Sequence, residues 1–283
     1  MLKIKGYQLN ENPVYKGKRS IIHRGLRITD DQAVIIKTSI NEFPSIKEIN
    51  RLQREFKIGQ EITHKNVIRY FALEKYGRSW AIITEDFGAV SLVEMIPVQG
   101  YDPLSFLKIA LQIVEAVGAI HKLEIVHKDL NPRNILIGNR GMEVRLIDFG
   151  ISSHLKEEPA FQANLNNIDG NLAYISPEQT GRMNRGVDFR ADFYSLGVTF
   201  YEAITGRLPF NESEPLELVY NHIAKTPLSP FEIQEIIPQP ISDIVMKLLR
   251  KNAEDRYQSA YGLKCDLAEC LRQLETSGKI VNF

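Results

Sequence analysis

The pattern of hydrophobic and polar positions divides the chain into a strand-rich first part and a mainly helical remainder. In the first part, short β-branched runs separated by Gly and Asp predict strands at residues 7–9, 20–24, 33–37 and 80–84. One helical pattern interrupts them at residues 48–61, where Ile49, Leu52 and Phe56 recur on one face. The first 86 residues are therefore expected to form a small sheet with one main helix.

Helical patterns dominate after residue 86. The run 104–122 is apolar nearly all round, which is typical of a buried central helix. A second helix is predicted at 192–205, before Gly206, and amphipathic patterns predict three more at 215–225, 241–250 and 258–275. Strands first and helices afterwards predict an α+β fold of two lobes, 1–86 and 87–283, with a cleft between them.

A polar loop stands out in the second part. The segment 125–134, Ile-Val-His-Lys-Asp-Leu-Asn-Pro-Arg-Asn, lies between two short apolar runs that predict strands. Such a loop can direct Asp129 and Asn134 into one cavity, and Asp148 of Asp-Phe-Gly follows another short strand. One carboxylate to receive a proton, with an Asn and an Asp to hold Mg²⁺, suits transfer of a phosphoryl group to a hydroxyl. The alternative, two acidic surface turns, is disfavoured by their order and spacing.

Composition narrows the possible classes of protein. The chain is 43% hydrophobic and 25% charged, as in ordinary soluble proteins, and its 35 basic and 35 acidic residues give no net charge. This balance argues against a nucleic-acid-binding module. We find no N-terminal signal segment and no apolar run long enough to span a membrane. Cys265 and Cys270 are expected to be reduced thiols, so the sequence predicts a cytoplasmic location.

With these motifs in this order, the sequence resembles the eukaryotic-type protein kinases over nearly its whole length. The resemblance implies a bilobal fold, ATP and Mg²⁺, and transfer of the γ-phosphoryl group to Ser or Thr hydroxyls of a protein substrate. Asp129 matches the catalytic base, and Lys37 the strand lysine that pairs with the α- and β-phosphates. Glu55 is then the expected ion-pair partner of Lys37. Asn134 and Asp148 match the metal ligands.

The resemblance also implies a nucleotide pocket. Thr84 stands at the gatekeeper position before a hinge, and the implied nucleotide contacts are Gly17, Ile22, Ile35, Lys37, Thr84, Glu85, Phe87 and Leu136. Glu178 of Ser-Pro-Glu is expected to pair with Arg256, and Asp192 to support the catalytic loop from below. Small-molecule kinases of the aminoglycoside type share the His-x-Asp and Asn elements, but these last three residues are a protein-kinase feature.

The loop that covers the nucleotide departs from the family pattern. Where the family has Gly-x-Gly-x-x-Gly, residues 15–20 keep only Gly17. Glycines let backbone N–H groups approach phosphates, so their loss puts ATP affinity in question. Lys16, Lys18 and Arg19 add charge instead. They either hold phosphates by Coulomb attraction or form a solvated basic hairpin, and the sequence leaves both open.

The catalytic loop departs from the pattern as well. Asn131 stands in place of the Lys that contacts the γ-phosphate, and Asn171 in place of the Thr that contacts this Lys. A hydrogen bond between the two amides would preserve the shape of the loop but remove a cation, which predicts a slow enzyme. Lys128 replaces the Arg that clamps an activation-loop phosphate. Because 151–175 contains no Thr, a phosphorylation switch is not expected there.

One position in the predicted helix of the first lobe also departs from the family. Gly59, four residues after Glu55, stands where the family usually has an apolar residue. The sequence explains it only as a loose helix.

A narrower resemblance concerns the context of the chain. Residues 174–185 and 254–274 resemble the kinase domains that open bacterial hybrid sensor proteins, which combine Ser/Thr and histidine kinases. This implies sensor and ATPase-like modules of the same parent chain as partners. A second hypothesis, motivated by the missing glycines and by Asn131 and Asn171, is a pseudokinase that binds nucleotide or partners as a signalling scaffold. Arg182, Arg185 and Arg190 either contact an acidic partner or are paired internally.

Overall fold

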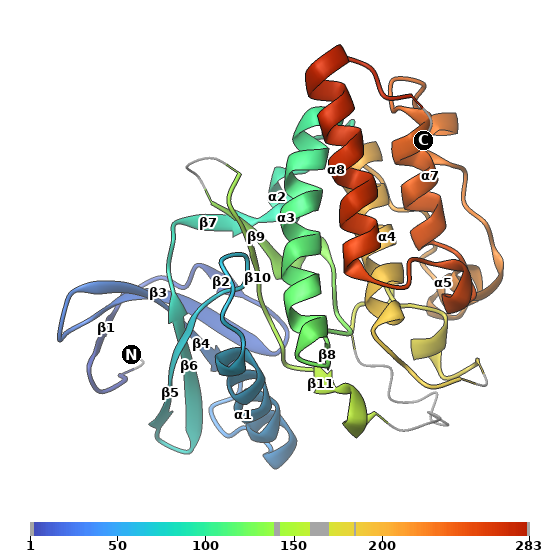
Figure 1. The fold of residues 1–283 in the computed structure, drawn as a ribbon. Coiled ribbons are helices and arrows are strands. Elements are labelled where there is room, and N and C mark those ends of the chain that lie inside the picture. The colour runs from blue at the N-terminus through green and yellow to red at the C-terminus, as the bar shows by residue number, and fades with distance from the viewer. Residues whose placement is uncertain (1–2, 139–141, 159–169, 184, 282–283) are drawn as a thin grey trace.

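The structure, a computed structural model, describes residues 3–138, 142–158, 170–183 and 185–281, and these form the two lobes that the sequence predicted (Figure 1). The described part of the smaller lobe contains a six-stranded antiparallel sheet. Five strands follow the order β1 (Tyr7–Leu9), β3 (Ser20–Arg27), β4 (Gln32–Ser39), β6 (Ser79–Glu85) and β5 (Tyr70–Tyr76). The short β2 (Tyr15–Lys16) pairs with β3.

Strand register decides which side chains face the larger lobe. Val34 and Ile36 of β4 are buried in a small cluster on one face of the sheet. Alternation therefore places Ile35 and Lys37 on the opposite face. This face is covered by α1 (Ile46–Glu61), which begins at Ser45 with a capping box formed with Glu48. The predicted helix thus lies directly beside the strand lysine.

The larger lobe is built around α3 (Pro103–Lys122), which runs beside α8 (Ala260–Ser277) (Figure 1). By length and hydropathy alone α3 would pass as a membrane span, but half of it is buried and it packs against α8, α4 and β10. The other helices here are α2 (Leu92–Met95), α4 (Arg190–Thr205), α5 (Pro215–Ala224), α6 (Pro230–Ile233) and α7 (Gln239–Leu248). Predicted and observed bounds of the long helices agree within two residues.

Short strands lie where the lobes meet and hold the polar loops. One three-stranded sheet has the order β10 (Val144–Leu146), β9 (Ile135–Gly138) and β7 (Ala89–Ser91). A two-stranded sheet pairs β11 (Ser153–His154) with β8 (Ile125–Val126). The catalytic-loop segment runs from β8 to β9 through the 3-10 turn η1 (Pro132–Asn134), as the sequence predicted.

The strand β5 was not predicted. Its burial does not alternate, and its pairing with β6 is shifted by an irregularity between Tyr70 and Ala72. A strand without alternating polarity has no signal of period two, so only its partner β6 identifies it.

A buried ion pair connects the segment after the active-site loops to the end of the chain. Arg256 lies at the end of the 3-10 turn η4 (Ala253–Asp255), and Glu178 begins the turn η3 (Glu178–Thr180). Two guanidinium nitrogens donate to the two carboxylate oxygens at 2.7 and 2.9 Å. The remaining N–H groups donate to the carbonyls of Arg190, Arg250 and Lys251. The predicted pair is confirmed, and every donor of Arg256 is used.

We expect Arg256→Ala to lower the free energy of unfolding by about 3–5 kcal/mol, because it leaves the Glu178 carboxylate buried without its cation. Arg272→Ala is the matched control, because Arg272 pairs with Glu269 at the surface of α8, and it should leave the unfolding midpoint unchanged. Urea unfolding followed by fluorescence measures both. Equal losses in the two variants would contradict the importance of the buried pair.

Candidate active site

Lys37 connects the two lobes. Its ammonium lies 2.9 Å from each carboxylate oxygen of Glu55 on α1 and 3.1 Å from Oδ1 of Asp148, which follows β10. The ion pair of Lys37 with Glu55 is thus confirmed as a contact. The strand, the helix and the Asp-Phe-Gly segment, far apart in sequence, meet at this one cation.

Burial and charge set the protonation of this group. Burial alone would lower the pKa of Lys37, but the Asp148 and Glu55 carboxylates outweigh it and raise the pKa above its usual value. Burial raises the pKa of Glu55, opposed by Lys37, yet two oxygens at equal distance from an ammonium are the geometry of an ionised carboxylate. Burial also acts on Asp148, but Lys37 and Arg51 lower its pKa to about 2. Asp148 is therefore ionised at neutral pH.

Asp129 is surrounded by amide groups. Asn131 Nδ2 donates to its Oδ1 at 3.1 Å, and Asn134 Nδ2 donates to its Oδ2 at 3.0 Å. The backbone N–H of Asn171 donates to Oδ1 at 3.1 Å. Burial and the nearby Asp148 raise the pKa of Asp129, while His127 and the N–H of Asn171 oppose the rise. The carboxylate is thus held in one orientation by three donors.

The hydrogen bond that the sequence allowed between the amides of Asn131 and Asn171 is not formed. Asn131 Oδ1 accepts from the N–H of Arg133, and Asn171 Oδ1 accepts from the N–H of Ala173. The two residues meet only through Asp129, because each amide oxygen caps a turn of its own segment. The direct pair was one way in which the sequence could have preserved the loop, and both residues contact the carboxylate instead.

Asp192, at the start of α4, supports the loop from below as predicted. Its Oδ1 accepts from the N–H of Lys128 at 2.8 Å, and its Oδ2 accepts from the N–H of His127 at 2.9 Å. His121 of α3 lies 2.9 Å from the same Oδ2.

Two residues of the site have a positive backbone φ angle: Lys128 with φ +68° and Asp148 with φ +65°. Non-glycine residues seldom adopt this region, so surrounding contacts must hold both conformations.

The oxygens of Asn134 and Asp148 fit a Mg²⁺ ion shared with phosphates. Asn134 uses its amide nitrogen for Asp129, so its amide oxygen remains for a cation. Asp148 is an ionised carboxylate whose Oδ1 accepts from Gly150 N–H and Lys37. Mg²⁺ takes oxygen ligands and keeps several waters, so one or two protein oxygens are sufficient when phosphates supply others.

The predicted nucleotide contacts lie on one face of the sheet. In the register of β3, β4 and β6, Ile22 is opposite Lys37 and Thr84 is opposite Ile35. Cross-strand partners share a face, so these four side chains point the same way. Leu136 of β9 is partly buried. The nucleotide contacts of these residues stay predictions.

The hinge and the covering loop have distinct features. Glu85 accepts the N–H of Arg69, and no partner among the described residues bonds the backbone N–H of Phe87, the kind of group that an adenine edge requires. Gly17 lies in the turn between β2 and β3, where its N–H donates to the Ser20 carbonyl at 2.9 Å. Lys16, Lys18 and Arg19 beside it are exposed.

Glu158 and Gln179, which the sequence did not identify, hold Lys128, the residue before Asp129. Lys128 donates to Oε1 of Glu158 at 2.6 Å, and both side chains are largely buried. Its carbonyl accepts from Gln179 Nε2 at 2.8 Å. Ser153 also donates to the Glu158 carboxylate. Glu158 lies thirty positions after Lys128 in an irregular segment, and no sequence pattern links the two.

The arginines of the basic stretch and a surface hollow lie apart from the residues around Lys37 and Asp129. Arg185 pairs with Glu254, and Arg190 pairs with Asp188 and Glu254, so two of the three arginines of the basic stretch are bound internally.

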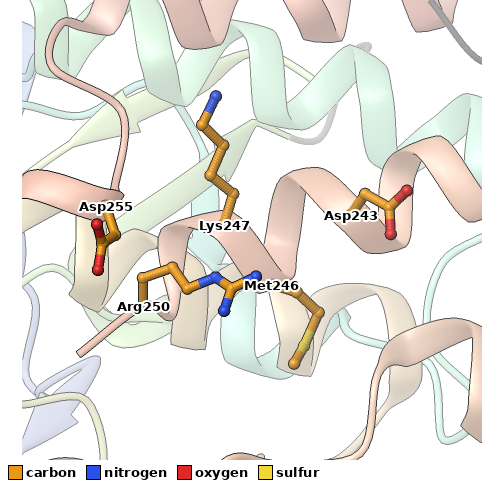
Figure 2. A pocket seen from close by; sticks show the side chains of 5 residues that line it. All are labelled: Asp243, Met246, Lys247, Arg250 and Asp255. Atoms are coloured by element: carbon orange, nitrogen blue, oxygen red, sulfur yellow. The ribbon is translucent and has the colours of Figure 1, made fainter. Parts of the chain in front are cut away.

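A shallow hollow of about 560 Å³ opens on the larger lobe (Figure 2). It is lined by Asp243, Met246 and Lys247 of α7, by Arg250 just after this helix, and by Asp255 of η4. The hollow includes none of the predicted site residues.

Comparison with known proteins agrees with the geometry. The family model described as protein kinase domain matches residues 10–267. Serine/threonine-protein kinase PksC of Streptomyces coelicolor is 30% identical over 94% of this chain and 48% of its own. PrkC of Bacillus subtilis is 31% identical over 84% of this chain and 36% of its own. PknB of Mycobacterium tuberculosis is 28% identical over 92% of this chain and 42% of its own. The chain thus spans less than half the length of these relatives.

We expect ATP with Mg²⁺, at ~100 times its Kd, to stabilise the protein by about 2.7 kcal/mol, which raises Tm by about 5–10 °C. Asp148→Ala should abolish the part of this shift that depends on Mg²⁺, because it removes the ionised oxygen ligand. Asp255→Ala, which removes an exposed carboxylate from the hollow of Figure 2, is the control and should keep it. A shift that is indifferent to Mg²⁺ in the unmodified protein would contradict the metal assignment.

Proposed function

The chain belongs to the protein kinase family, and from that premise we propose that it transfers the γ-phosphoryl group of ATP to Ser or Thr hydroxyls of proteins in a signalling context. The observation that carries the proposal is the complete set of polar groups at the junction of the lobes. Lys37 forms ion pairs with Glu55 and Asp148, and Asp129 accepts a hydrogen bond from Asn134.

In this proposal Asp129 orients the substrate hydroxyl and receives its proton. The three donors around its carboxylate restrict its rotation, and positioning of this kind is a large part of catalysis in phosphoryl transfer. Lys37, kept in place by Glu55, holds the α- and β-phosphates. Mg²⁺ beside Asp148 and Asn134 would neutralise charge on the β- and γ-phosphates.

We also propose that the transfer is slow. Asn131 donates to the side chain and the carbonyl of Asp129, so a neutral amide occupies the place where the family has a Lys. A single electrostatic stabiliser is often worth ~3 kcal/mol in the barrier. The pseudokinase hypothesis starts from the same substitution. It is less well supported, because neither of the two oxygen ligands for the metal is lost.

The context of the chain is proposed from the narrower resemblance of residues 174–185 and 254–274 to the kinase domains of hybrid sensor proteins. On that basis we propose that sensor and ATPase-like modules of a parent chain are its partners. A cytoplasmic location and a boundary between the lobes at residues 86 and 87 also stay predictions.

A transfer assay with labelled ATP and Mg²⁺ tests the proposed activity. We expect label on the protein itself or on a generic Ser/Thr substrate, and a loss of about 10²–10⁴-fold in Asp129→Ala, because the proton acceptor is gone. Asp243→Ala, which changes a carboxylate on α7, serves as the control and should keep full activity. If the unmodified protein labels nothing above Asp129→Ala but still binds ATP, the scaffold hypothesis replaces the enzyme.

The pair of Lys128 and Glu158 supports a further part of the proposal, that the kinase needs no phosphate on its activation loop. The only hydroxyl side chains between residues 149 and 175 are Ser152, Ser153 and Tyr174, and all three are buried. Residues 159–169 lie outside the described part of the chain, and their sequence contains no Ser, Thr or Tyr. Glu158 supplies the negative charge that a phosphate would otherwise bring to Lys128.

We expect Glu158→Ala to lower kcat by roughly tenfold to a hundredfold, because it frees the residue next to Asp129 and small displacements of catalytic groups are costly. Exchanging the charges, with Lys128→Glu and Glu158→Lys together, should restore part of the loss. Treatment of the purified protein with a phosphatase should leave its kcat unchanged. A loss of activity after that treatment would contradict this part of the proposal.

A further inference from the structure

Gly59 and Tyr70 fit together between α1 and β5. Gly59 lies on the buried face of α1, one turn after Glu55. A Cβ atom at this position would lie 2.5 Å from Cδ2 and 2.6 Å from Cζ of Tyr70. Any larger side chain on the helix would therefore exclude the tyrosine ring. Glycine is a poor residue for a helix interior, so its presence here calls for a local reason, and the ring supplies one.

The ring of Tyr70 continues a column of aromatic side chains. It contacts Phe56 of α1 edge to face, with centroids 6.3 Å apart, and Phe149 with centroids 6.2 Å apart. Phe149, directly after Asp148, lies 5.0 Å from the ring of His127 in the catalytic loop. The two contacts of Tyr70 are edge to face, a preferred arrangement of aromatic rings, and that of Phe149 with His127 is tilted. The column leads from α1 to the loop that carries Asp129.

The hydroxyl of Tyr70 reaches the ion pair. It donates to Oε1 of Glu55 at 3.4 Å, and this oxygen also binds the ammonium of Lys37. Burial and the carboxylates of Glu55 and Asp148 raise the pKa of Tyr70 well above its usual value. The hydroxyl therefore keeps its proton and acts as a donor to the carboxylate. One residue thus combines packing on the helix with a polar contact to the active site.

We propose that Tyr70 is a positioning residue of the kinase reaction, whose ring replaces the side chain missing at Gly59 and whose hydroxyl fixes Glu55 in place for Lys37. The inference rests on the proposed function and extends it to a residue that contacts no reacting group. It also replaces the interpretation of Gly59 as a loose helix: the space beside it is filled from the neighbouring strand.

Tyr70→Phe tests the hydroxyl. We expect kcat/KM for ATP to fall by about threefold to tenfold, which is typical of one lost hydrogen bond of ordinary strength and fits the long 3.4 Å contact, while Tm changes little because the ring stays. KM for the protein substrate should not change. In a Glu55→Gln background the same substitution should have no further effect, because the hydroxyl acts through the carboxylate. Tyr76→Phe, on the same strand but within the other hydrophobic cluster, is the matched control.

An unchanged kcat/KM for ATP in Tyr70→Phe, or an equal fall in both backgrounds, would overturn the role of the hydroxyl.

Exchanging the bulk between helix and strand tests the ring. Gly59→Leu alone should lower Tm through the clash, and Tyr70→Leu alone should lower it through the cavity that it leaves. The double variant Gly59→Leu with Tyr70→Leu should be more stable than Gly59→Leu, because the space is filled again from the helix. Losses that simply add would overturn the fit between the two positions.

The two experiments separate this inference from the proposed activity. The comparison of Tm among the two single variants and the double variant requires no phosphoryl transfer. It therefore reports on Gly59 and Tyr70 even if the protein labels no substrate. Suppose that the unmodified protein is active and that the losses of Tm at Gly59 and Tyr70 do not simply add. An unchanged kcat/KM for ATP in Tyr70→Phe would then refute only the positioning role. If no transfer occurs, the proposed function fails while the packing result stands.

Discussion

The interaction on which the structure depends is the contact of one ammonium, that of Lys37, with the carboxylates of Glu55 and Asp148. A buried carboxylate (Glu55) and a partly buried one (Asp148) so close together would repel each other without a shared cation. With it, the sheet and α1 of the smaller lobe are connected to the segment after β10 of the larger one. The relative positions of the groups that would hold ATP and Mg²⁺ follow from this contact.

The polar loop of the larger lobe is held by contacts that surround it. Asp192 accepts from two successive backbone N–H groups, Gln179 donates to the Lys128 carbonyl, and Glu158 binds the Lys128 side chain. These contacts keep Lys128 at a positive φ, which the residue alone would not favour. A strained backbone supported on three sides is a rigid base from which Asp129 can be presented.

Several departures from the kinase pattern are matched by a second residue that is distant in sequence. The space beside Gly59 is filled by Tyr70, and the charge of Lys128 is met by Glu158. Asn131 and Asn171 both contact Asp129, although they do not bond to each other. Each pair fits because volume or charge in a packed interior must be balanced locally, whichever segment supplies the balance.

The order of motifs and the periodicity of hydrophobic residues determined the two lobes, the long helices and the candidate residues Asp129, Asn134 and Asp148, because these signals are local and their spacing is characteristic. The resemblance to the protein kinases added Lys37 and Glu55 to the candidates. The strand β5, the partner of Lys128, the hydrogen bonds of Asn131 and the reason for Gly59 were decided only by the tertiary structure. Each of these features depends on a contact with a side chain from another segment of the chain. No pattern within a single segment predicts such a contact, because only the packing of the folded chain brings the two segments together.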